Sequence, residues 1–108
     1  ASPDVQTEHS TTPLMLAIKR DHVEGVSLLL QARANVSLAD EAGCTALMHG
    51  LSGGNVKVAE LLLDSGASVD VVDGAGRTPL FHATMGGQID AIRLVVARGG
   101  RVNILDEE

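Results

Sequence analysis

The sequence is poor in aromatic residues and in cysteine. Phe81 is the only aromatic residue among 108, and Trp and Tyr are absent. Any core must therefore be built from aliphatic side chains. Cys44 is the only cysteine, which excludes a disulfide within the chain and favours a reducing compartment. We therefore expect an intracellular location, with the cytoplasm favoured over the nucleus.

Positive charge and long apolar runs are also scarce. Eight Lys and Arg residues against 14 Asp and Glu residues give a net charge of -6, which disfavours contact with a phosphate backbone. The aromatic side chains on which single-stranded bases stack are lacking as well. No apolar run approaches the roughly 20 residues that a transmembrane helix needs. The composition thus favours neither nucleic-acid binding nor membrane insertion.

What the sequence does contain is a repeat of 33 residues. A tetrapeptide that begins with Thr and has Leu in third place occurs three times, and so does a triplet of aliphatic residues. Segments 40–72 and 73–105 align without gaps at 11 of 33 positions, more than unrelated segments would share. This period predicts stacked supersecondary units. The tetrapeptides stand at 12–15, 45–48 and 78–81, and the triplets at 28–30, 61–63 and 94–96.

Each unit is predicted to be a pair of helices. Its Thr stands where a hydroxyl would cap the first helix, and Pro follows in two of the units. After a polar or Gly-rich break, a second helix has apolar residues at i, i+3, i+6 and i+7. Gly66, Gly99 and, in the first unit, Arg33 stand where a left-handed residue would end it. These apolar positions are Val23, Val26, Leu29, Leu30, Val56, Ala59, Leu62, Leu63, Ile89, Ile92, Val95 and Val96.

The pattern resembles the ankyrin repeat. The resemblance rests on Asp-x-x-Gly-x-Thr-Pro-Leu at 73–80 and its counterpart at 40–47, followed by a helix, Gly, and a second helix with Leu-Leu-Leu. It covers the whole chain in one register. It implies an all-α fold, an ankyrin-repeat solenoid of stacked antiparallel helix pairs with β-hairpin-like finger loops. The fingers and the first helix of each pair would form a concave surface.

The resemblance also sets the expected domain organisation. Residues 1–108 would form a single ankyrin-repeat domain, continuous with further repeats because the outer repeats keep apolar faces. Its expected parts are the tail of a preceding repeat at 1–6, full repeats at 7–39, 40–72 and 73–105, and the start of a following repeat at 106–108.

The chain departs from the family pattern in its first helices. The His that usually follows Thr-Pro-Leu is replaced by Met15, Met48 and Phe81. We therefore expect apolar packing in place of the usual polar link between repeats. Gly50 stands where Ala is usual, at a cost of roughly 0.8–1 kcal/mol in a helix interior.

In similar repeats, partners touch the finger tips and the ends of the first helices. Carried over position by position, this predicts a surface with acidic and basic groups, suited to a protein partner of mixed charge. The alternative is that these are ordinary solvated loop residues. The predicted contact residues are Glu8, His9, Thr11, Lys19, Arg20, Glu41, Ala42, Cys44, Ser52, Gly53, Gly74, Ala75, Arg77, Met85 and Gly86, with Glu107 and Glu108 continuing the row.

Metal binding and catalysis have little support. His49 and His82 are equivalent by repeat, but stacked helices lie about 8–10 Å apart, too far for both to bind one ion. Cys44 is expected on a finger, away from these helices. The residues suggest no trio of nucleophile, base and orienting group, and the Gly-rich breaks lack the Lys-Ser/Thr ending of a phosphate loop. We expect no catalytic residues, no metal and no cofactor.

The resemblance therefore implies a protein–protein interaction module that binds a peptide or a folded partner on its concave face. The alternative is a structural spacer or scaffold segment within a larger multidomain protein, such as an enzyme, channel or adaptor, with binding done by other repeats. An enzyme active site within this segment is disfavoured.

Overall fold

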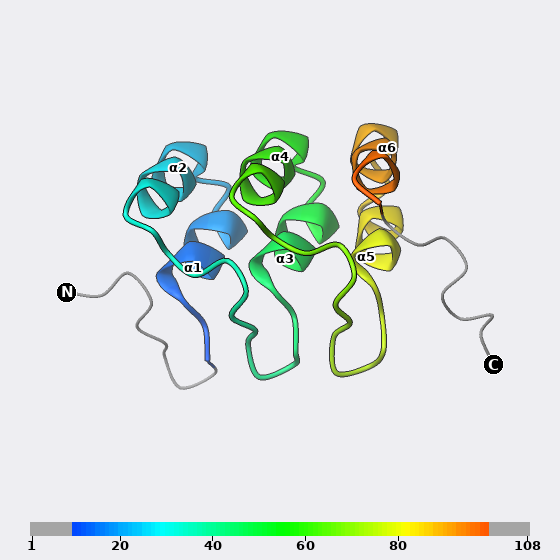
Figure 1. Cartoon of the computed structure of the whole chain (residues 1–108), viewed down its shortest axis with the longest axis horizontal. Coiled ribbons are helices and arrows are strands. Elements are labelled where there is room, and N and C mark those ends of the chain that lie inside the picture. Colours follow the sequence, from blue (N-terminus) through cyan, green and yellow to red (C-terminus); the bar gives the residue numbers. More distant parts are fainter. Residues whose placement is uncertain (1–9, 100–108) are drawn as a thin grey trace.

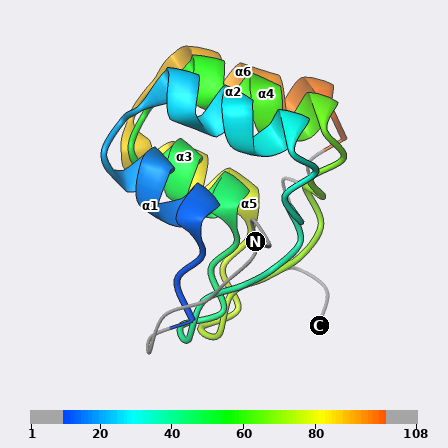
Figure 2. The ribbon, with the colours of Figure 1, turned by 90° about the vertical axis from the view of Figure 1, so that its left-hand side faces the viewer.

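The computed structural model describes residues 10–99, which form helices in three antiparallel pairs (Figure 1). The prediction of stacked helix pairs is confirmed. Figure 2 shows two layers, with α1, α3 and α5 below α2, α4 and α6, and the loops projecting from one edge. Within residues 10–99 no helix is long and apolar enough to cross a bilayer. The helices are α1 Pro13–Lys19, α2 Val23–Gln31, α3 Ala46–Ser52, α4 Val56–Asp64, α5 Pro79–Gly86 and α6 Ile89–Ala97.

The first helix of each pair begins at the predicted threonine. The hydroxyls of Thr12, Thr45 and Thr78 accept from the backbone N–H three residues later, at 3.1, 3.4 and 3.1 Å. Each of these bonds satisfies one N–H group that a helix start leaves without a partner. The three first helices therefore begin in the same register, which aligns them in the stack.

The residue after the C-cap of each second helix is left-handed, as predicted. Gly66 and Gly99 have φ values of 99° and 98°, and Arg33 takes the same conformation at 68°. Two second helices also have side-chain caps at their start. His22 Nδ1 accepts from the Gly25 N–H at 2.8 Å, and Asn55 Oδ1 accepts from the Val58 N–H at 3.1 Å.

The finger loops are less sheet-like than expected. Within residues 10–99 the only β pairing is a single bridge between Ala39 and Thr45. The reason is local, because Asp40 Oδ1 accepts from the N–H groups of Ala42 and Cys44, both at 3.0 Å. The carboxylate thus takes N–H groups that a longer ladder would use.

Neighbouring fingers are joined by their backbones. The Gly74 N–H donates to the Ala42 carbonyl at 2.8 Å. A Cβ atom on Gly74 would lie 2.8 Å from that same oxygen, closer than real Cβ atoms come. Glycine is required here by the close approach of one finger to the next.

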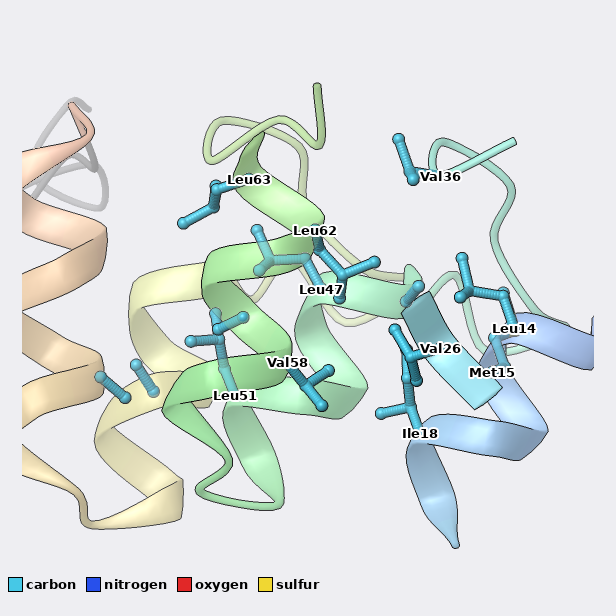
Figure 3. Close-up of a cluster of buried hydrophobic side chains, with 14 of the residues drawn as sticks. Leu14, Met15, Ile18, Val26, Val36, Leu47, Leu51, Val58, Leu62 and Leu63 are labelled. Atoms are coloured by element: carbon cyan, nitrogen blue, oxygen red, sulfur yellow. The ribbon is translucent and has the colours of Figure 1, made fainter. Parts of the chain in front are cut away.

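The core is aliphatic and continuous through the stack, as the composition predicted. Leu14, Leu47, Leu51 and Leu62 are each 1% exposed or less and belong to one cluster with Val95 (Figure 3). Such fully buried side chains contribute about 1.5–3 kcal/mol each relative to exposure. Because the cluster crosses every seam between pairs, the three pairs form one cooperative stack.

Two of the predicted apolar positions of the second helices are exposed. Ile89 is 64% exposed and Val96 is 45% exposed. Leu63, which is equivalent to Val96, is buried because α6 packs on its side of α4. Within residues 10–99 no further helix pair covers α6 in the same way. The repeat pattern predicted the face correctly, but burial depends on the neighbour.

The presence of glycine at position 50, inside α3, is explained by packing. Its position faces α4, where a Cβ atom would lie 3.2 Å from Val58 Cγ1. The absence of a side chain lets α3 and α4 approach closely, and this offsets the cost of glycine in a helix.

Candidate functional site

Those predicted contact residues that the structure describes lie on the fingers and at the C-terminal ends of the first helices. Glu8, His9, Glu107 and Glu108 lie outside the described residues, as do the expected flanking segments 1–6 and 106–108. The described residues of the set differ in their surroundings. Some of them line recesses, and others take part in packing between repeats.

Two recesses meet at Lys19, on the side of the fingers. One has a volume of about 300 Å³ and is lined by Thr11, Lys19, Asp40, Glu41 and Ala42. The other, of about 520 Å³, lies between the helix pair α1–α2 of repeat 1 and the helix pair α3–α4 of repeat 2, and is hereafter called the seam groove. Its lining residues are Ile18, Lys19, Asp21, His49, Gly50, Ser52, Gly53 and Asn55. The structure thus brings together Thr11, Lys19, Glu41, Ala42, Ser52 and Gly53 from the predicted set.

Arg20 is separated from this group. It lines another recess, of about 340 Å³, with Pro13, Leu16, Ala17, His22 and Gly25. Lys19 and Arg20 are adjacent in sequence, but the helix turns them to different faces.

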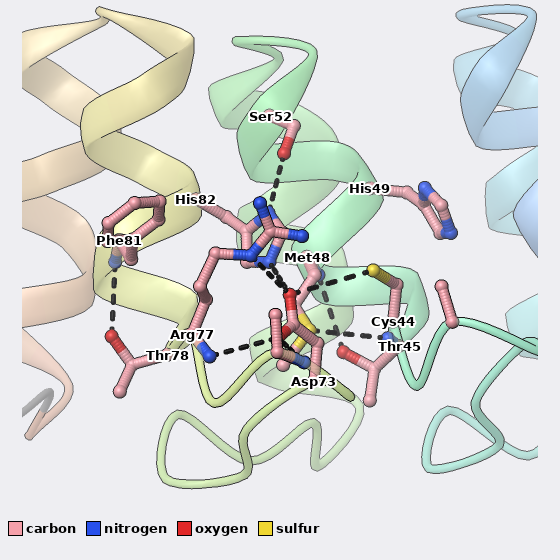
Figure 4. A network of polar contacts seen from close by, with 12 residues as sticks. Cys44, Thr45, Met48, His49, Ser52, Asp73, Arg77, Thr78, Phe81 and His82 are labelled. Carbon is pink, nitrogen blue, oxygen red and sulfur yellow. Dashed lines mark hydrogen bonds and ion pairs between the residues drawn. The ribbon is translucent and has the colours of Figure 1, made fainter.

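Asp73 is the centre of a buried polar network (Figure 4). Its side chain is 0% exposed. Oδ1 accepts from the N–H groups of Ala75 and Arg77, both at 2.9 Å. Oδ2 accepts from Arg77 Nε at 3.0 Å and from His82 Nε2 at 2.9 Å. The carboxylate thereby holds the finger turn against the start of α5.

The charge of Asp73 is stabilised by these donors. Burial alone would raise the pKa of the carboxyl group. The hydrogen bonds from Arg77, His82 and Ala75 outweigh burial and hold the pKa of Asp73 well below its usual range. Asp73 is therefore ionised at neutral pH, and Arg77 Nε and His82 Nε2 both donate hydrogen bonds to it.

A polar link joins repeats 2 and 3, so the expectation of purely apolar packing is wrong at this seam. His82 Nε2 donates to Asp73, and its Nδ1 accepts from the Ser52 hydroxyl at 2.9 Å. Met48 is fully buried, as expected, whereas Phe81 is 43% exposed. His82, which follows the position where Phe81 replaces the usual His, therefore supplies the polar link between repeats 2 and 3.

Asp40 forms a more open copy of the same arrangement in repeat 2. Besides the Ala42 and Cys44 N–H groups, it accepts from His49 Nε2 at 2.8 Å, and its side chain is 12% exposed. Burial tends to raise the pKa of Asp40, but the bonds from His49, Cys44 and Ala42 outweigh it and lower the pKa. Cys44 stands where Arg77 stands in repeat 3, so the guanidinium donor is missing.

Cys44 lies on a finger, as expected, but the expectation that it lies away from the helices is wrong, because its Sγ is within 4.8 Å of a ring nitrogen of His49 on α3 and of His82 on α5. Its Sγ lies 4.0 Å from Asp73 Oδ2, on the next finger, and the residue is half-buried. Cys44 can be grouped with Asp40 and His49, or with Asp73 and His82, as three potential metal ligands within 4.8 Å of one another. However, metal ligation requires a thiolate and free carboxylate lone pairs. The Asp73 carboxylate already accepts four hydrogen bonds from N–H groups, so these residues are better suited to a hydrogen-bonded network than to a metal site.

The thiol of Cys44 is expected to react slowly with alkylating reagents. Burial, and next the negative charges of Asp40 and Asp73, raise its pKa. The thiolate is the reactive form, so iodoacetamide at pH 8 should alkylate Cys44 more slowly in the folded chain than in urea. Asp40→Asn removes one of the two carboxylates and should accelerate the folded-state reaction. Equal rates for the folded and unfolded chains would contradict the buried position.

Three of the predicted contact residues have evident packing or network roles. Gly86 packs against repeat 2, where a Cβ atom would lie 2.2 Å from the Leu51 carbonyl oxygen. Gly74 joins the fingers, and Arg77 is bonded to Asp73. Sequence reasoning missed Asp40 and Asp73 as organising residues, although their spacing of 33 was visible.

The fold and the network define a helical-repeat solenoid in which polar links connect one unit to the next. The family model described as "Ankyrin repeats (3 copies)" matches residues 1–73 and 43–106. The chain belongs to the ankyrin repeat family. Members are generally protein–protein interaction modules and are typically non-catalytic. A comparison with curated proteins gives no match.

Proposed function

We propose that the chain is a protein-interaction module whose concave face, formed by the fingers and the first helices, binds a peptide or a folded partner. The observation that carries this proposal is the pair of adjoining recesses at Lys19. Their lining combines a cation, carboxylates and the exposed Gly53, which suits a polypeptide with polar side chains. No catalytic residue, metal or cofactor enters the proposal.

Lys19→Glu is expected to weaken binding of a peptide selected from a random library by about tenfold, because Lys19 borders both recesses. The matched control is Lys57→Glu, which makes the same charge change on α4 in the other layer. Isothermal titration calorimetry measures both. Arg77 is unsuitable as a test position, because a glutamate beside buried Asp73 would disturb the fold itself.

The spacer alternative has a distinct outcome. If neither selected peptides nor selected folded domains bind, the segment acts as a structural connector. If they bind and Lys19→Glu has no more effect than Lys57→Glu, the chain binds proteins through another face.

A further inference from the structure

We propose that the seam groove receives a Ser or Thr side chain of an extended partner peptide, whose hydroxyl donates to His49 Nδ1. The proposal rests on the proposed function and deepens it, because it names the chemical group that the groove recognises. It starts from a comparison of the two seams of the molecule.

At the seam between repeats 2 and 3, the chain itself supplies a hydroxyl to the histidine, from Ser52. His82 projects from α5 toward α3, and the Ser52 hydroxyl lies 2.9 Å from His82 Nδ1 (Figure 4). At the seam between repeats 1 and 2, His49 projects in the equivalent way toward repeat 1. The residue equivalent to Ser52 is here Lys19, which has no hydroxyl, and among residues 10–99 its ammonium makes no hydrogen bond to His49.

The tautomer of His49 makes Nδ1 an acceptor. Nε2 lies 2.8 Å from Asp40 Oδ2, and an ionised carboxylate only accepts, so Nε2 carries the proton of a neutral ring. Among residues 10–99 no group donates to Nδ1. The side chain of His49 is 19% exposed and lines the seam groove, whereas that of His82 is 5% exposed, so a ligand in the groove can reach the ring of His49.

The charges around the groove select the donor. Lys19 repels a partner ammonium or guanidinium, and an ionised partner carboxylate has no proton to donate to Nδ1. A neutral hydroxyl meets neither obstacle. It is also the group that the chain itself places on the equivalent nitrogen of His82.

The shape of the groove suits an extended backbone. Gly50 and Gly53 contribute no side chains to its lining. The Asn55 side-chain amide donates to the Asp21 carboxylate across the seam, linking repeats 1 and 2 at this groove. A volume of about 520 Å³ exceeds what one Ser or Thr side chain fills, so neighbouring backbone atoms of the peptide enter as well.

The test uses short random synthetic peptides on an array, probed with the wild-type chain. For the tightest binders, each Ser or Thr is replaced in turn by Ala or Val, and affinity is measured by calorimetry. One replacement is expected to weaken binding about tenfold, the effect of losing a single well-placed hydrogen bond.

Lys19→Ser and Lys19→Ala form the decisive pair of variants. Lys19→Ser introduces a hydroxyl equivalent to that of Ser52, so it should occupy Nδ1 and abolish the preference for the hydroxyl-bearing peptide. Lys19→Ala also removes the charge but leaves Nδ1 open, so the preference should persist. Urea unfolding checks that both variants are folded; the exposed position of Lys19 makes this the expected result.

The outcomes separate the two proposals. Peptides that bind without dependence on any hydroxyl, or a preference that survives Lys19→Ser, overturn the hydroxyl site and leave the interaction function standing. The absence of any bound peptide or folded domain overturns the interaction function and the hydroxyl site with it.

Discussion

Replacing Asp73 with alanine is expected to lower the free energy of unfolding by about 3–5 kcal/mol, measured by urea denaturation followed by circular dichroism. The carboxylate is fully buried and accepts from four N–H groups. Its removal leaves His82 and the turn amides without their acceptor, and each unsatisfied buried donor costs about 1–3 kcal/mol. The finger of repeat 3 and its link to Ser52 should loosen together.

Asp40→Ala is the matched control. Asp40 occupies the same place in repeat 2, but it is partly exposed and no Arg among residues 10–99 donates to it. Water can replace some of the lost bonds, so we expect a loss of about 1–2 kcal/mol. Equal losses for the two variants would show that the Arg77 bond and the burial of Asp73 have little effect on stability.

The pH dependence of stability gives an independent check on Asp73. Its pKa is lowered on folding, so its contribution is fully present above the unfolded value of about 3.9. The contribution is lost as pH falls from there toward the folded pKa. The stability difference between the wild type and Asp73→Asn should therefore be constant near neutrality and shrink in acid. A difference that grows below pH 4 would contradict the ionised network.

Gly86→Ala is expected to destabilise the chain by about 1–3 kcal/mol, although alanine is normally the better helix former. The added Cβ would lie 2.2 Å from the Leu51 carbonyl oxygen, which belongs to the backbone of α3 and cannot rotate away. Repeats 2 and 3 would have to separate at this seam. The change would also disturb the bond between Ser52 and His82, which crosses the same seam.

Gly53→Ala should have the opposite sign. Gly53 is equivalent by repeat and has a right-handed backbone conformation that alanine adopts freely. A Cβ there meets nothing nearer than 3.4 Å, so we expect a gain of about 0.4–1 kcal/mol, largely through the lower entropy of the unfolded chain. Thermal unfolding of both variants measures the contrast. Higher stability of both variants would contradict the close contact between Gly86 and the Leu51 carbonyl oxygen.

The helix pairs and the core were predictable from the sequence because their causes are local or periodic. A threonine that caps a helix acts on an N–H group three residues away, and Gly66 ends a helix through its own backbone preference. The spacing of 33 then places each unit in the same register. Even the left-handed conformation of Arg33 followed from its repeat equivalence to Gly66.

The roles of the candidate site residues depended on contacts across the seams. Cys44 meets Asp73 and Ser52 meets His82 over separations of 29 and 30 residues, and the local sequence carries no sign of either contact. Sequence alone thus determined which elements form, their order and which faces are apolar. Only the tertiary structure decided that Gly86 packs between repeats and that His49 faces an open groove. The physical reason is that capping and periodicity act within a unit, whereas side-chain partners depend on how closely two units approach.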